Sequence, residues 1–464
     1  MPCICLLIVK NSSISLFSET PYKTGKKKGN LSMQWLEMHN MEYGECVVMG
    51  GKQSILMVDC GTVNQYIREG ETPPEKYLEQ ICRRYSGLSQ HHFLLSHFHR
   101  DHLNGFAYLL KKHPDYFNRV YLPCSPADST GALPLIDFAL FARLFLPPQN
   151  GCAQINTTSL RAFDLIGDMA GLEHITVLGA GDVIEWDGCE YEVLWPPREG
   201  HEFPPLFSMV TEQLNVMLSI PYYTGCEKQF LSYKDEFCRM YRQCCENLSP
   251  GNRAGEEKCR RDAARLHELL EVMHGLRDEL NRSPAAPDIR ELLEQPSTRE
   301  AYSEAVNGAS VVFHNLRTGS AGVNDILMTG DATPDVFDQL RDQLYDGYYI
   351  VKAPHHGTAS GYSPVLAELA ISHLLISNGE YHAGGQISRD YLEWPCVRHC
   401  TNPSVCKWYQ TADCCCNRLA CCYEQPSGGG LTIKCPAAMG LSRDAGCGVY
   451  LIGPGGERGC LCDL

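Results

Sequence analysis

The sequence predicts a layered α/β domain that is interrupted by a helical segment. From about Met33, short apolar segments of strand length alternate with segments of helical spacing, which is typical of mixed α/β domains. Residues 206–306 break this alternation, and strand-like segments resume after them. With 464 residues, the chain has room for one large domain with insertions or for two domains.

The first half is predicted to open with a hairpin that is followed by a helix. Residues 45–49 and 54–58 are apolar segments separated by a turn with two glycines, a pattern typical of paired strands. A helix is predicted over residues 75–86, and a strand over residues 92–95 leads directly into a histidine-rich loop. Further short strands are predicted at residues 120–122, 175–178, 191–194, 310–313 and 325–328.

Residues 206–306 are predicted to form an inserted helical hairpin. One helix is indicated by apolar residues between Phe230 and Cys244, and a turn at residues 250–252 separates it from the next. The second helix carries an apolar face at three- and four-residue spacing, formed by Leu266, Leu269, Leu270, Met273, Leu276 and Leu280. This face either packs on the parent domain or provides a surface for self-association or a protein partner.

The segments before and after the α/β pattern differ from it in composition. Residues 1–31 end in a basic, glycine-containing loop and are predicted to be an N-terminal extension. The α/β domain is expected in two halves, 32–205 and 307–395, on either side of the insertion. Residues 396–464 form a region rich in cysteine and glycine, with one clear strand at residues 431–433.

Cysteine is unusually frequent, with 25 residues in the chain. We find no secretory signal, so reduced thiols or bound metal are expected rather than a disulfide framework. Cys396, His399, Cys400 and Cys406 are spaced loosely like a structural zinc site, but thiols packed as small apolar side chains explain them equally well.

The formal net charge of −15 disfavours a protein that coats nucleic acid through non-specific phosphate contacts. The charge does not exclude a nuclease, because bound metal ions can reverse the local field. No segment is long enough to span a bilayer, and the apolar run at residues 3–9 lacks the basic region of a signal peptide. We therefore expect a cytoplasmic protein that does not enter the membrane.

The loop after residues 92–95 contains the strongest chemical signal in the sequence. His97, His99, Asp101 and His102 place four metal-ligand side chains within six residues. The His-x-His spacing puts two imidazoles on one side of an extended segment, and Asp101 and His102 can turn toward a second ion. A surface histidine cluster is the alternative, but the motif directly follows an apolar strand.

These motifs resemble the metallo-β-lactamase superfamily and, within it, the soluble domain of ComEC-type competence proteins. The similarity extends over about residues 33–435, interrupted by insertions. The matching segments are residues 44–46, 55–61, 95–105, 191–197, 307–310, 327–331, 351–358, 377–379 and 409–411. The resemblance implies a metallo-β-lactamase αββα sandwich with a helical insertion and a cysteine-rich C-terminal extension.

The resemblance also implies a site for two divalent ions, with Zn or Mn as the expected metals and Fe compatible with the same ligands. His97 and His99 would bind one ion. Asp101, His102 and one of His355 and His356 would bind the other. Asp331 would bridge the two ions, and Asp59 would hold the loop by hydrogen bonds.

One histidine of the superfamily pattern is missing from the sequence. The superfamily usually has a Pro-Gly-His sequence after a strand, whereas this strand ends at Trp195, Pro196 and Pro197. ComEC-type domains resemble this chain in lacking the histidine. His201 lies a few residues further on and could substitute for it, although a histidine in a loop is commonly exposed to solvent instead.

Such a site predicts a hydrolase that uses a metal-activated water. Asp101 is the candidate to orient or deprotonate the water, and Lys352 or the histidine of His355 and His356 that binds no metal could stabilise the leaving oxygen. The ComEC-like motifs point to a phosphodiesterase or nuclease with nucleic acid as its substrate.

Two alternatives to the nuclease remain. One is a hydrolase of a lactone, a thioester or a cyclic nucleotide, and the other is an inactive scaffold that binds a partner through residues 206–306. A basic rim at the cleft would favour the nuclease, and a closed apolar pocket would favour a small substrate.

Overall fold

A computed structural model gives the fold of most of the chain. The predicted N-terminal extension at residues 1–31, the motif at residues 409–411 and Cys406 lie outside the described residues. The described residues are 33–62, 74–147, 159–163, 166–167, 171–219, 225–317, 325–379, 387–401, 430–434, 449–453 and 456–458.

The described strands form two mixed sheets, one of nine strands and one of seven. The nine-stranded sheet runs in the order β16-β15-β14-β1-β2-β3-β4-β5-β6, and its strands are β1 Trp35–His39, β2 Gly44–Gly50, β3 Ser54–Thr62, β4 Gln90–Leu94, β5 Arg119–Pro123, β6 Ile175–Leu178, β14 Gly430–Lys434, β15 Val449–Gly453 and β16 Gly456–Arg458. The seven-stranded sheet runs in the order β13-β12-β11-β10-β9-β8-β7, and its strands are β7 Val183–Trp186, β8 Cys189–Trp195, β9 Val312–Asn315, β10 Ile326–Met328, β11 Gly347–Lys352, β12 Ala370–Ile376 and β13 Val397–Cys400.

Most of the strands predicted from the apolar pattern are present. β2 and β3 pair as the predicted antiparallel hairpin, and β3, β4, β5 and β6 continue the sheet in parallel. The strand predicted at residues 431–433 is part of β14, which pairs with β1. The strand expected at residues 310–313 begins two residues later, because Ser310 and Val311 form the turn that leaves a helix.

The two sheets pack against each other through a shared apolar layer. Along β3, Leu56 and Val58 point into this layer, whereas Ile55 and Met57 point to the opposite face of the sheet. The alternation follows from the two-residue period of a strand, and it leaves every residue of β3 buried. The architecture is therefore mixed α/β and compatible with the expected αββα sandwich.

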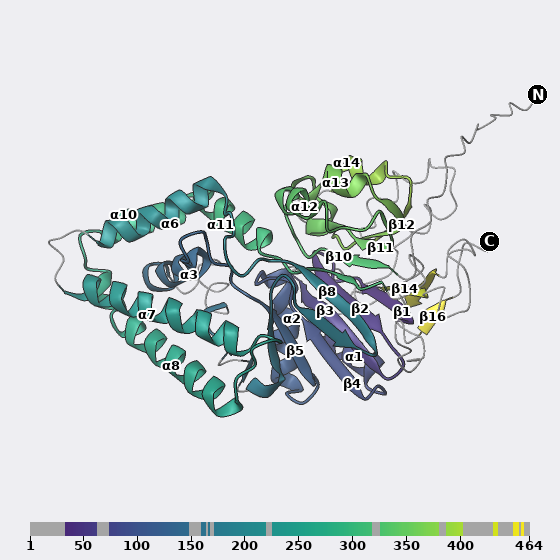
Figure 1. The fold of residues 1–464 in the computed structure, drawn as a ribbon, viewed down its shortest axis with the longest axis horizontal. Helices are drawn as coiled ribbons and strands as arrows, with labels where there is room; N and C mark the ends of the chain where they lie inside the picture. The colour runs from purple at the N-terminus through teal and green to yellow at the C-terminus, as the bar shows by residue number, and fades with distance from the viewer. Residues whose placement is uncertain are drawn as a thin grey trace, which may run out of the picture. The chain divides into compact units, whose positions relative to one another are not determined.

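Helices cover the outer faces of the two sheets (Figure 1). Two helices pack on the nine-stranded sheet directly, and three short helices accompany the seven-stranded sheet. The first two are α1 Pro74–Tyr85, at the predicted position, and α2 Arg100–Lys112; the other three are α12 Pro334–Leu340, α13 Pro364–Ala367 and α14 Arg389–Leu392.

The predicted helical hairpin proves to be part of a larger helical region. Within its described residues it contains six helices: α6 Pro205–Leu218, α7 Cys226–Asn247, α8 Glu256–Gly275, α9 Arg277–Leu280, α10 Ala286–Glu294 and α11 Pro296–Gly308. α7 and α8 are the predicted pair and lie side by side (Figure 1). Proline occupies the first turn of α6, α10 and α11, where its missing N–H costs nothing, and this signal marks the helices that the apolar pattern did not reveal.

The helical region packs on the rest of the domain. The apolar face of α8, including Leu266, Leu269 and Met273, is buried in one continuous core with α2 and with α3, Pro134–Phe145. Lys234 of α7 forms an ion pair with Asp137 of α3 at 3.1 Å. The face that suggested a partner surface is therefore used inside the chain. Within the described residues, no helix combines the length and the apolar character needed to cross a membrane.

Candidate metal centre

The predicted ligands meet at the carboxyl ends of strands that belong to both sheets. The loop between β4 and α2 carries His97 and His99, and the first turn of α2 carries Asp101 and His102. Asp331 follows β10 in the other sheet. The ends of parallel strands place loop side chains at one edge, so residues that are distant in sequence converge there.

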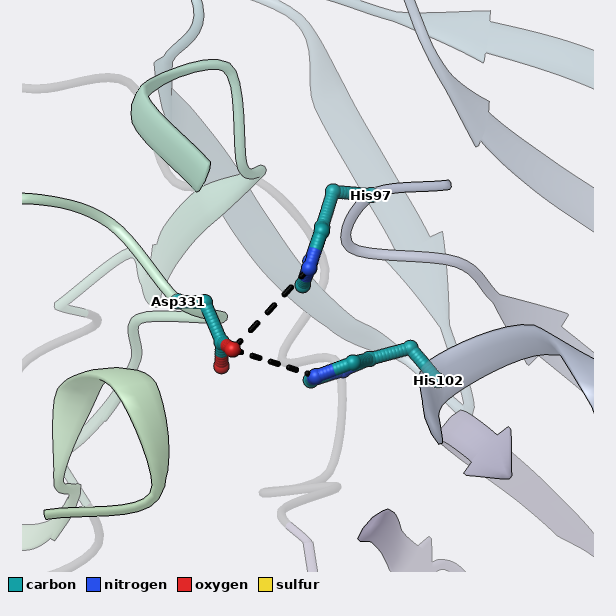
Figure 2. Close-up of side chains that lie close together, drawn as sticks. All are labelled: His97, His102 and Asp331. Atoms are coloured by element: carbon teal, nitrogen blue, oxygen red, sulfur yellow. Dashed lines mark ion pairs between the residues drawn. The ribbon is translucent and has the colours of Figure 1, made fainter. Parts of the chain in front are cut away.

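His97, His102 and Asp331 form one group of possible metal ligands, and all three side chains are buried. Asp331 Oδ2 lies 3.2 Å from His102 Nε2 and 3.9 Å from His97 Nε2. Figure 2 shows the imidazoles of His97 and His102 pointing toward the carboxylate of Asp331, which comes from the other sheet. The donor atoms of the group lie within 4.8 Å of one another.

Asp101, His102 and His356 form a second group, which shares His102 with the first. His356 Nε2 lies 3.1 Å from Asp101 Oδ2 and 3.4 Å from Asp331 Oδ2. His102 Nε2 lies 3.9 Å from Asp101 Oδ2. Asp331 therefore contacts histidines of both groups, at the position expected for a bridging carboxylate.

His99 and His355 lie outside these two groups, but they border them. His99 Nδ1 is 3.0 Å from His97 Nε2, so it faces the first group. His355 Nδ1 instead lies 2.8 Å from Ser360 Oγ. Of the two adjacent histidines His355 and His356, the structure places His356 among the possible ligands, and the assignment of His355 to the metal is not supported by this geometry.

Hydrogen bonds fix the orientation of two of the imidazoles. Asp59 accepts hydrogen bonds from the Ser96 backbone N–H at 2.7 Å and from its hydroxyl at 2.6 Å. Asp59 Oδ2 also lies 2.8 Å from His102 Nδ1, as expected for the residue that holds the loop. His356 Nδ1 donates to the Ser377 carbonyl at 2.9 Å. Both bonds leave Nε2 of the ring directed at the carboxylates.

Lys352 lies directly beside Asp331 in the interior of the protein. Its ammonium donates to the Gly330 carbonyl at 2.8 Å and lies 3.3 Å from Asp331 Oδ1 and 3.2 Å from Glu45 Oε2. Only 1% of Lys352 is exposed and its ammonium is occupied by these three partners, so its role at a leaving oxygen stays a prediction. Glu45 was not recognised as a site residue, although a carboxylate within the apolar strand β2 was a visible signal.

Burial and neighbouring charges act together on the pKa values of the site. Burial raises the pKa of Asp331, but His102, His356 and Lys352 outweigh it, and the net pKa lies well below the ordinary value. Burial lowers the pKa of His102, and the three carboxylates around it raise the pKa far above the ordinary value. A compact set of carboxylates and imidazoles of this kind holds strong charges that a divalent cation can balance.

The residues fit a divalent metal ion. Within the described residues, the buried Nε2 of His102 makes no hydrogen bond and lies 3.2 Å from Asp331 Oδ2 and 3.9 Å from Asp101 Oδ2, which suits a ligand atom. Two atoms that bind one ion at about 2.1 Å lie about 3.0 to 3.4 Å apart, and the His97–His99 and Asp101–His356 pairs meet this spacing. Imidazole nitrogen and carboxylate oxygen suit Zn, Mn or Fe.

His201 does not join either ligand group. Its ring packs edge-on against Trp195 and Phe203, and its backbone N–H donates to Ala127 at 2.9 Å. Only 5% of His201 is exposed, and burial lowers its pKa to about 4. His201 therefore packs in the interior, and it does not take the place of the histidine ligand that is missing from the superfamily pattern.

The zinc-like cysteine pattern does not form a metal site within the described residues. His399 Nε2 instead faces His373 Nδ1 at 2.9 Å, and neither residue joins a cluster of metal ligands in the part of the chain that the structure describes. The first metal group borders a mostly apolar cavity of about 30 Å³, lined by His97, Phe98 and residues of α3, α7 and α11. Pockets for small molecules usually measure several hundred cubic ångströms, so this cavity is not the closed substrate pocket that would favour the small-molecule alternative.

Comparison with known proteins adds no assignment. No protein-family profile matches the chain, and no curated protein is significantly similar to it. The functional proposal therefore rests on the geometry of the site and on the order of the sequence motifs.

Proposed function

We propose that this chain is a metal-dependent hydrolase of the metallo-β-lactamase fold that cleaves phosphodiesters. The observation that carries the proposal is the position of Asp331, whose Oδ2 lies within 3.9 Å of imidazole nitrogens of His97, His102 and His356. A carboxylate that contacts histidines of both ligand groups suits a pair of ions, and paired ions are common in enzymes that cleave phosphate esters.

Bound divalent ions would lower the pKa of a water molecule and stabilise the negative charge that develops on the attacked group. Asp101 is the candidate to orient or deprotonate this water, because 16% of its side chain is exposed, against 2% for Asp331. Asp59 and Ser377 keep His102 and His356 in the orientation that serves the ions.

Phosphodiesters are proposed because the order of motifs resembles ComEC-type domains, which implies nucleic acid as the substrate. Hydrolysis of a lactone, a thioester or a cyclic nucleotide is the second candidate. The net charge of −15 favours this second candidate, since a long polyanion is repelled by an acidic protein. We also propose a cytoplasmic location, which agrees with buried thiols such as those of Cys46, Cys60 and Cys124.

An activity screen of the metal-loaded protein tests the proposal. The metal-free protein is loaded with Zn, Mn or Fe and offered bis(4-nitrophenyl) phosphate, single-stranded DNA, duplex DNA, RNA, a lactone and a thioester. Asp331→Asn removes the shared carboxylate, and Asp338→Asn on α12, whose side chain is 65% exposed, is the matched control.

We expect the wild type and Asp338→Asn to cleave the phosphodiester and Asp331→Asn to lose this activity. Turnover of the lactone or the thioester alone would overturn the phosphodiesterase assignment and support the second candidate. Full activity of Asp331→Asn would contradict both.

A further inference from the structure

The last turn of α11 brings a buried carboxamide to the edge of the metal centre. Asn307 Nδ2 lies 3.5 Å from His355 Nε2, at the outer limit of a hydrogen bond. Only 4% of Asn307 is exposed, and its Oδ1 has no hydrogen-bond partner within the part of the chain that the structure describes. One polar atom of the carboxamide, Oδ1, is therefore buried, and no described residue forms a hydrogen bond with it. We call this the open position.

The backbone around Asn307 is fixed to the strands that carry the metal ligands. The indole N–H of Trp195 donates to the Gly308 carbonyl at 2.6 Å, and the Val311 N–H donates to the Ser96 carbonyl at 2.9 Å. Ser310 Oγ accepts a hydrogen bond from the backbone N–H of Asp331 at 3.1 Å. The chain that follows Asn307 is thus tied to Asp331.

His355 is held in position from the other side. Its backbone has a φ of 46°, which L-residues rarely adopt, and Ser360 Oγ lies 2.8 Å from its Nδ1. This arrangement places Nε2 of the imidazole beside the carboxamide of Asn307. Two polar groups from distant parts of the chain therefore border the metal centre without belonging to either ligand group.

A buried polar atom without a partner is unfavourable, so such positions are rare unless a ligand or water completes them. Rotation of the amide by 180° exchanges its oxygen and nitrogen, so the open position can hold an N–H donor while the carbonyl faces His355. A neutral N–H donor beside a metal centre stabilises an oxygen on which negative charge develops.

We infer that Asn307 is a further catalytic residue, which donates a hydrogen bond to an oxygen of the group under attack. This inference rests on the proposed function and adds a substrate contact from the helical region. The ligand it requires is an anionic phosphoryl oxygen, and inorganic phosphate is the simplest probe of that chemistry.

Three variants test the inference in the metal-loaded protein. Asn307→Ala removes the donor, and Asn307→Asp keeps the shape of the side chain but places a negative charge at the open position. Asn215→Ala is the matched control, because it removes an amide of the same helical region that contacts Asp137 at 3.2 Å. The measurements are metal content, kcat and KM for bis(4-nitrophenyl) phosphate, and binding of inorganic phosphate by calorimetry.

We expect Asn307→Ala to keep its metal and to lose about 100-fold in kcat, with a small change in KM, as for the loss of one such donor in other enzymes. Asn307→Asp should lose at least as much, and both variants should bind phosphate about 10-fold more weakly, whereas Asn215→Ala should match the wild type. Normal kcat and phosphate binding in Asn307→Ala would overturn the inference, and so would loss of its metal. If the wild type cleaves no phosphodiester but binds phosphate through Asn307, the proposed function fails while the assigned contact stands.

Discussion

Replacement of Lys352 by methionine should destabilise the protein strongly, because Lys352 and Glu45 form an ion pair in the interior. Methionine keeps most of the length of the side chain and removes its charge. Each of the two residues is 1% exposed, and the ammonium lies 3.2 Å from Glu45 Oε2 and 3.3 Å from Asp331 Oδ1. The substitution removes the ammonium from beside two buried carboxylates and the shortest hydrogen bond to the Gly330 carbonyl.

The loss of one partner of a buried ion pair typically costs about 3 to 5 kcal/mol, and we expect a decrease of this size in the free energy of unfolding. The double variant Glu45→Gln/Lys352→Met removes both charges of the pair and should recover about 2 kcal/mol of this loss. Arg341→Met is the control, because Arg341 pairs with Glu368 at the surface and such pairs contribute about 1 kcal/mol or less.

Urea denaturation of the metal-free proteins, followed by circular dichroism, measures these differences. Metal affinity is then measured on each variant that folds, and Lys352→Met should bind metal more weakly because Asp331 is no longer held. The single variant Glu45→Gln is measured as well. A loss of unfolding free energy below about 1 kcal/mol for Lys352→Met would refute the role of the pair. It would also be refuted if the loss in the double variant equalled the sum of the losses in Lys352→Met and Glu45→Gln.

Three further outcomes follow from the positions of individual side chains. His356→Ala should lose bound metal, whereas His355→Ala should retain it, as measured by elemental analysis of the purified proteins. Asp59→Asn, which tolerates the positive φ of this residue, should weaken metal affinity about 10- to 100-fold because His102 loses its orienting acceptor; an unchanged affinity would contradict this. Burial holds the pKa of His201 at about 4, below about 6.5 in the unfolded chain, so stability is lost as pH falls through this range. Between pH 7 and pH 5, the free energy of unfolding of His201→Phe should therefore fall by about 2 kcal/mol less than that of the wild type, as measured by urea denaturation. The variant should keep its metal. An equal fall in both proteins would be inconsistent with a neutral buried ring.

Local patterns in the sequence predict much of the fold. Paired apolar segments around the turn at residues 50–53 identified β2 and β3, and the three- and four-residue spacing around Leu266 identified α8. The number of helices in the region was underestimated, because α6 and α11 do not carry one long apolar stripe; their starts are marked by Pro205 and Pro296. The spacing of apolar residues also cannot show that α8 packs on the parent domain, because this packing involves α3, which is distant in sequence.

In the site, too, the sequence predicts groups of residues that are adjacent in the chain and does not predict contacts between residues that are far apart. The cluster from His97 to His102 was visible because its members are adjacent in sequence. The choice between His355 and His356 depends on backbone turns with positive φ, which the sequence does not reveal. Glu45 lies more than 300 residues from Lys352, so its contact with that residue appears only when two sheets meet.

Metal titration of the wild type and Asp331→Asn, followed by turnover of bis(4-nitrophenyl) phosphate on the same samples, tests the central claim most directly. The account predicts two divalent ions per wild-type chain and metal-dependent cleavage. It predicts that Asp331→Asn loses at least one ion and its activity, because the shared carboxylate contacts histidines of both ligand groups. A wild type that binds no divalent ion, or an Asp331→Asn protein with full metal content and full turnover, would contradict the account.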